Sequence, residues 1–151
     1  MAKNYELGKV VQIELINGKY GYGLVLEEPL VAFSENVFDE PQSDFDVLFY
    51  SSTFSLWVMK SALGKTGWTK VSKIENHPLM GQEHKFYKFD AISKKFSIYS
   101  GGVEIPATKT ECLDLECAAV WSREHVEDRL LAINENRECI WKTTLSAHAR
   151  V

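Results

Sequence analysis

The chain has 151 residues, with 17 Lys and Arg against 21 Asp and Glu, so its formal net charge is −4. Apolar residues make up 45% of it, charged residues 25% and aromatic residues 12%, which excludes a disordered or fibrous chain. This length supports one hydrophobic core, and we expect a single domain over residues 1–151. A mildly acidic chain lacks the positive field that phosphate backbones attract, so we expect no nucleic-acid partner.

The sequence predicts a cytoplasmic protein without a membrane segment. Residues 1–6 contain no apolar stretch of the secretory type, and no run approaches the roughly 18 apolar residues of a membrane helix. The three cysteines, Cys112, Cys117 and Cys139, form an odd set, which favours reduced thiols that are buried or inert. Their spacing is not that of a zinc site, so we expect neither a metal nor a cofactor.

The first half of the chain reads as strands. Apolar and polar residues alternate from Val11 to Leu15, and Asn17-Gly18 then predicts a hairpin with a type I′ turn. In the returning strand, residues 19–26, Tyr20 and Tyr22 share one face while two glycines share the other. Two glycines on one face indicate a close backbone approach or a strongly bent strand.

Further short apolar runs predict more strands, separated by Pro, Ser and Gly turns. These runs are residues 30–33, 45–50, 54–59, 67–74, 85–89, 95–99 and 103–105. Residues 117–121 read as a buried strand or a helical turn. The regular spacing favours a mostly antiparallel sheet or a partly open barrel.

One main helix is predicted near the C-terminus. Ser122 is a suitable N-cap, and Val126, Leu130 and Ile133 recur at helical spacing to form a buried stripe. Arg123 and Glu127, four residues apart, are placed to pair on the exposed side. Asn residues at 134–136 favour an end to the helix there. The predicted fold class is α+β, with this helix packed on the sheet.

Charge is unevenly distributed along the chain. Residues 21–59 contain no Lys or Arg and seven acids, whereas residues 60–95 contain eight lysines and three acids. One interpretation is a set of ordinary solvated loops; the other is an acidic loop that meets a basic protein partner. The second interpretation assigns partner binding to the five acids of residues 35–46, which are Glu35, Asp39, Glu40, Asp44 and Asp46.

Signals for catalysis are weak, and we predict no catalytic residue. The segment 19–23 lacks the third glycine and the following helix of a phosphate-binding loop. His125 and Arg129, four residues apart, are either a catalytic pair or a pair that orients the helix. The alternative function is therefore a small-molecule-binding β-domain or small enzyme that combines the face of Tyr20 and Tyr22 with His125 and Arg129.

Two segments interleave lysine with aromatic residues, residues 85–89 and 94–99. If the rings were exposed, they would form a stacking platform for single-stranded nucleic acid. In half-buried strands the aromatic rings face the core and the lysines face water. The second interpretation is favoured.

Two motifs resemble the immunity protein 26 family. The first is Asn17-Gly18-Lys19-Tyr20-Gly21-Tyr22-Gly23-Leu24-Val25-Leu26, followed by residues 29–33. The second is Glu111-Cys112-Leu113-Asp114-Leu115-Glu116-Cys117-Ala118-Ala119-Val120-Trp121, which continues into His125-Val126-Glu127-Asp128-Arg129-Leu130. Their order and separation extend the resemblance from about residue 8 to about residue 144.

The resemblance implies a cytosolic, mostly β protein that binds and neutralises the C-terminal domain of a cognate toxin, without catalysis. The family occurs beside toxin genes in bacterial polymorphic toxin systems, including contact-dependent growth inhibition. The resemblance also implies signature residues that maintain the fold, namely Gly21, Gly23, Glu116, Trp121, His125 and Arg129. Specificity is then expected in divergent loops, which again indicates residues 35–46. The sequence leaves the oligomeric state open.

Overall fold

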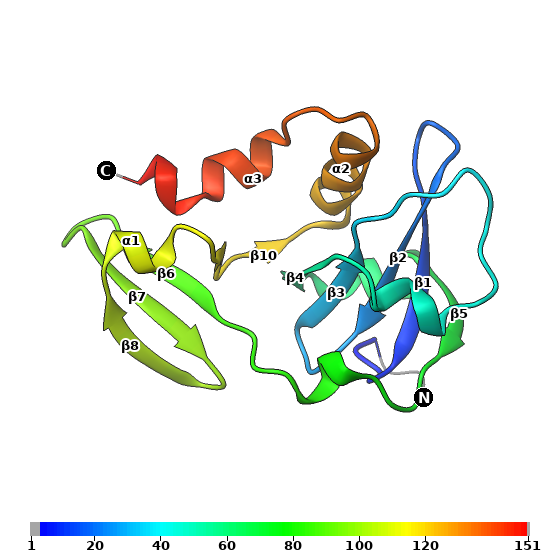
Figure 1. Ribbon diagram of the computed structural model, residues 1–151, viewed down its shortest axis with the longest axis horizontal. Coiled ribbons are helices and arrows are strands. Elements are labelled where there is room, and N and C mark those ends of the chain that lie inside the picture. Colours follow the sequence, from blue (N-terminus) through cyan, green and yellow to red (C-terminus); the bar gives the residue numbers. More distant parts are fainter. Residues whose placement is uncertain (1–3, 151) are drawn as a thin grey trace. The chain divides into compact units, whose positions relative to one another are not determined.

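The computed structural model describes residues 4–150, which form two compact units. Unit 1 contains residues 4–81 and 120–139, and unit 2 contains residues 82–119 and 140–150. The described residues form ten strands in two mostly antiparallel sheets that are not closed, and one of the three α-helices is long (Figure 1). The predicted α+β class is confirmed, whereas the single domain stays a prediction.

Unit 1 is built on a six-stranded sheet with the order β10-β4-β3-β2-β1-β5. All neighbours pair antiparallel except β10 and β4, which are parallel. The strands are β1 (Lys9–Glu14), β2 (Tyr20–Val25), β3 (Leu30–Ser34), β4 (Thr53–Val58), β5 (Thr69–Lys73) and β10 (Val120–Trp121). Two short 3-10 helices lie between these strands, η1 (Asp46–Phe49) and η2 (Lys60–Leu63), and a third, η3 (Pro78–Gly81), follows β5.

The predicted hairpin of β1 and β2 is present, but its turn is not type I′. Leu15 N–H donates to the carbonyl of Lys19, so the loop has three residues, Ile16 to Gly18. Gly18 has a φ of +81°, whereas Asn17 does not have a positive φ. A three-residue loop that ends in a left-handed glycine is also common in hairpins. The pair Asn-Gly is compatible with this loop and with the two-residue type I′ turn.

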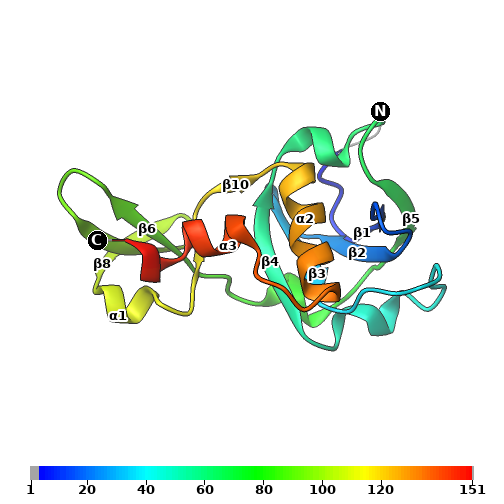
Figure 2. The same ribbon diagram turned by 90° about the horizontal axis from the view of Figure 1, so that it is seen from above.

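The two faces of this sheet are covered by different elements. Helix α2 (Arg123–Asn134) lies across one face, as both ribbon views show (Figures 1 and 2). A Cβ built on Gly21 would lie 2.8 Å from Leu130 Cδ1, so the predicted close approach is confirmed at Gly21. The opposite face carries a buried apolar cluster that includes Tyr22, Leu24, Leu48 and Phe49.

Helix α2 follows the prediction closely at both ends. Ser122 Oγ accepts the N–H of His125 at 3.3 Å, and Arg123 Nε lies 2.8 Å from Glu127 Oε2. Asn136 follows with a φ of +54°, the left-handed conformation expected beyond a helix end. The predicted stripe is wrong at its last position: Val126 and Leu130 are buried, whereas Ile133 is 37% exposed.

The predicted strand over residues 45–50 is wrong, because this run forms η1. Leu48 and Phe49, adjacent in sequence, are both buried, while Val47 and Tyr50 are exposed. That is a helical burial pattern, and periodicity alone does not separate strand from helix in so short an apolar run. Strand β4 pairs instead with β3 and β10.

Unit 2 is built on a four-stranded sheet with the order β8-β7-β6-β9. Its elements are β6 (Phe86–Asp90), β7 (Lys95–Ser100), β8 (Val103–Ala107), α1 (Lys109–Cys112), β9 (Glu116–Cys117), α3 (Ile140–Leu145) and η4 (Ala147–Ala149). Its core is formed by Tyr87, Cys112 and Ala147, with half-buried aromatic and aliphatic residues around them. The strand predicted over residues 117–121 is present only at its ends, which belong to two short strands of different sheets, β9 and β10.

Candidate functional site

The acidic segment, residues 35–46, links β3 to η1 and is the long loop drawn in cyan tones in Figure 1. Every acid that the sequence assigned to partner binding is exposed in it. The segment is nevertheless held to the sheet. Tyr20 N–H donates to the carbonyl of Phe38 at 2.8 Å, and Phe38 N–H returns a bond to Tyr20 at 2.9 Å.

Tyr22 holds the next part of the segment. Its hydroxyl accepts the backbone N–H of Gln42 at 2.7 Å and donates to Gln12 Oε1 at 2.9 Å. Its ring contacts those of Phe38 and Phe45, at centroid distances of 5.9 and 6.0 Å. Burial raises the pKa of the Tyr22 phenol, so the hydroxyl keeps the proton that it donates to Gln12.

The stretch that contains the acidic segment and η1 closes on itself at Ser51 and Ser52. Glu35 N–H donates to the carbonyl of Ser52 at 3.0 Å, and Asn36 Nδ2 donates to Ser51 Oγ at 3.0 Å. Surface loops that are held at their base on a rigid scaffold frequently carry function. The segment is therefore a preformed surface.

The carboxylates of the segment are mostly left for an external partner. Asp39 pairs with Lys19 Nζ, yet the Asp39 side chain remains 80% exposed. Among residues 4–150, Glu35, Glu40, Asp44 and Asp46 make no ion pair. The result is a concentrated negative field on one side of unit 1.

The charge pattern of the sequence predicts the acids but not the residues that present them. Tyr22 and the rings of Phe38 and Phe45 form the attachment, and Tyr50 lies where the loop closes. A signal for this was available, because two phenylalanines in an otherwise polar loop indicate that the loop docks on an apolar surface.

Several signature residues lie at the contact between α2 and the sheet. Arg129 is 3% exposed, and its guanidinium carbon lies 4.0 Å from the ring centroid of Phe54 and 5.3 Å from that of Trp121. Trp121 is itself 3% exposed on β10. A guanidinium over aromatic rings is a favourable buried arrangement for this cation.

The other signature residues occupy strands and the start of the helix. A Cβ on Gly23 would lie 3.1 Å from Phe33 Cε1 and 3.2 Å from Val11 Cγ2, so the sheet is tightly packed there. Glu116 is half-buried on β9, and His125 is half-buried in the first turn of α2. A role of this set in maintaining the fold stays a prediction.

The alternative site of the sequence analysis is not assembled in the structure. Tyr20 and Tyr22 lie on the face covered by the acidic segment, and Tyr22 is fully buried. His125 and Arg129 belong to α2, which covers the opposite face. The four side chains therefore do not line one common site.

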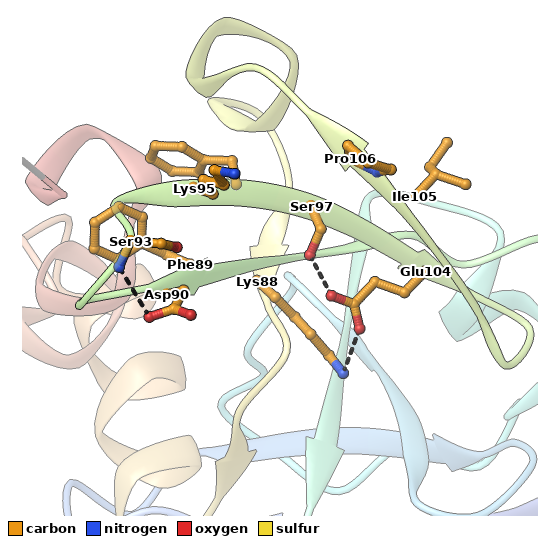
Figure 3. Close-up of a pocket in the computed structure, with 10 residues that line it drawn as sticks. Lys88, Phe89, Asp90, Ser93, Lys95, Ser97, Glu104, Ile105 and Pro106 are labelled. Carbon is orange, nitrogen blue, oxygen red and sulfur yellow. Dashed lines mark hydrogen bonds and ion pairs between the residues drawn. The ribbon is translucent and has the colours of Figure 1, made fainter.

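A shallow trough of about 560 Å³ lies on the sheet of unit 2 (Figure 3). In it Glu104 accepts hydrogen bonds from Ser97 Oγ at 2.7 Å and from Lys88 Nζ at 3.3 Å. These bonds lower the pKa of Glu104, and backbone N–H groups of Ile92 and Ser93 likewise lower that of Asp90. A general acid near neutral pH needs the opposite shift, so these carboxylates are poorly suited to that role.

The lysine–aromatic segments follow the favoured interpretation. Tyr87 is fully buried, and the rings of Phe89 and Phe96 pack on the core of unit 2. The aromatic residues of these strands thus support the fold of unit 2. Within residues 4–150, no group of three or more His, Cys, Asp or Glu side chains is arranged to hold a metal ion. No helix in the same range has the length and hydropathy of a membrane span.

The fold and the acidic segment define an α+β protein that presents a fixed acidic surface. The chain belongs to the immunity protein 26 family, whose sequence model matches residues 6–98. This membership supports an immunity function. The matched range contains the first motif and the acidic segment, whereas the second motif lies beyond it, and its resemblance stays a prediction. No curated protein and no solved structure matches the chain.

Proposed function

We propose that this chain is a cytoplasmic immunity protein that neutralises the C-terminal domain of its cognate toxin by forming a stoichiometric complex. It acts without catalysis, in a polymorphic toxin system of the contact-dependent type. The observation that carries the proposal is the acidic segment, which unit 1 holds in place while four of its five acids keep unpaired charge among the described residues. The family membership supplies the class of partner.

The acidic segment contacts a basic face of the toxin, through Glu35, Asp39, Glu40, Asp44 and Asp46. A nuclease suits this surface, because the cleft that holds a phosphate backbone is basic and a row of carboxylates resembles a row of phosphates. Charge of this kind accelerates encounter and fixes orientation more than it sets the affinity of the final complex.

The test is the association rate with the C-terminal domain of the toxin encoded beside this chain. Changing the five acids to Lys should slow association by roughly 10-fold or more and flatten its dependence on salt. A matched control changes five other exposed acids of unit 1 to Lys: Glu14, Glu27, Glu75, Glu124 and Glu138. Both variants carry the same net charge, so only position differs.

The control should retain most of the association rate and of its salt dependence. Equal slowing of the two variants would show that net charge, not the acidic segment, steers the encounter. Unchanged association in the first variant would remove the segment from the mechanism.

A further inference from the structure

An exposed apolar patch adjoins the acidic segment. Val47, within η1, is 58% exposed, and Tyr50, the residue that follows η1, is 63% exposed. Tyr50 N–H donates to the carbonyl of Val47 at 3.3 Å, and side chains three residues apart in a 3-10 helix lie one above the other. The two side chains therefore form one patch on the outer side of η1, while Leu48 and Phe49 are buried beneath it.

The Tyr50 ring is supported from behind by His77. The two ring centroids are 4.4 Å apart with an interplanar angle of 41°, and His77 is only 8% exposed. His77 is itself held, because its Nδ1 accepts the N–H of Leu79 at 3.1 Å. An aromatic ring that is already packed on one side loses little conformational freedom when a partner covers the other.

Acids adjoin the patch along the chain and at the neck of the loop. Asp46 precedes Val47 directly, and Glu35 is hydrogen-bonded to Ser52, two residues beyond Tyr50. An apolar and aromatic centre beside a charged rim is the usual anatomy of a protein interface, and tyrosine is enriched among its strongest contacts. A second copy of this chain would bring two acidic surfaces together, so the charge favours a basic partner.

We propose that Val47 and Tyr50 anchor the toxin domain, with the Tyr50 ring entering an apolar pocket on a basic face of the toxin. This inference rests on the proposed function and assigns the two parts of the surface different tasks. The acids govern how fast the complex forms, and the Tyr50 ring governs how slowly it dissociates.

The test uses the full chain and the same toxin domain, with both rate constants measured. Tyr50→Ala should weaken binding by about 30-fold or more, mainly through faster dissociation, with association little changed. Tyr50→Phe should retain most of the affinity, because it keeps the ring. Val47→Ser should weaken binding by a smaller factor. It tests the same patch independently if Tyr50→Ala folds poorly.

The matched control is Ile92→Ala, which removes a 95% exposed apolar side chain from the turn between β6 and β7 in unit 2. It should leave both rate constants unchanged. Tight binding by the unaltered chain together with unchanged dissociation of Tyr50→Ala and Val47→Ser would overturn the anchor and leave the proposed function standing. Absence of binding by the unaltered chain would instead overturn the proposed function. A dimer in light scattering that Tyr50→Ala dissociates would assign the patch to self-association and also overturn the anchor.

Discussion

Tyr22 connects the sheet to the acidic segment through a single hydroxyl group, which bonds to both Gln12 and Gln42. The strand pattern predicts which face of the sheet Tyr22 occupies, because side chains alternate along a strand. It does not predict the bond to Gln42, which lies 20 residues further along the chain. The alternation of side chains along a strand determines toward which face Tyr22 points. Its hydrogen-bond partner in the loop depends on the path by which the loop returns to the sheet.

His77 predicts a pH dependence of stability. Burial lowers the pKa of His77, and this effect exceeds the opposing attraction of the Asp46 carboxylate. The ring also contacts the rings of Phe49 and Tyr50 and accepts the Leu79 N–H. In the unfolded chain the pKa is about 6.5, so the unfolded state binds the proton first as the pH falls. The contribution of neutral His77 to the free energy of unfolding is therefore full above about pH 6.5.

That contribution is lost as the pH falls from about 6.5 through the lower pKa of the folded state, with a slope of at most about 1.4 kcal/mol per pH unit. His77→Asn keeps an acceptor for the Leu79 N–H and removes the titrating group. In urea unfolding between pH 5 and 7.5, the free energy of unfolding of the variant should decrease less steeply as the pH falls. Equal slopes in this window for both proteins would contradict the account.

At the scale of elements, α2 and the β1–β2 hairpin were predictable because their signals are local. The N-cap of Ser122 and the Asn-Gly turn each depend on residues within one turn. A capping box of Thr108 and Glu111 begins α1, and its sequence pattern, Thr followed three residues later by Glu, is also a local signal. The parallel pairing of β10 with β4 was not predictable, since Val120 meets Trp57 across 63 residues.

The packing of α2 on Gly21 predicts non-additive substitutions. Gly21→Ala places a methyl group against fully buried Leu130 and should cost about 1–3 kcal/mol in the free energy of unfolding. Leu130→Ala should cost about 2–5 kcal/mol through the cavity that it leaves. In the double variant the new methyl group has room, so the total should be smaller than the sum of the two costs.

Gly81→Ala is the matched control, because a Cβ there meets no atom within 4 Å. It should change the free energy of unfolding by less than about 0.5 kcal/mol. Additive costs of Gly21→Ala and Leu130→Ala in chemical denaturation would show that the close approach of α2 does not explain this glycine.

At the scale of the whole molecule, the acidic excess belongs to unit 1. Residues 1–81 and 120–139 carry ten Lys and Arg against fifteen Asp and Glu, a formal charge of −5, whereas the rest of the chain carries +1. The excess of acids could be predicted from the sequence, but the way in which the loop holds them on the surface of unit 1 could not. Presentation depends on Tyr22, Phe38 and the closure of the loop at Ser52, which are contacts between distant segments.

The most direct test of the central claim is a calorimetric titration of this chain with the C-terminal domain of the adjacent toxin at two salt concentrations. The account predicts a one-to-one complex of nanomolar or tighter affinity, which weakens as salt screens the acidic segment. Failure to bind at micromolar concentration in low salt would contradict the claim that this chain neutralises the toxin by forming a complex with it.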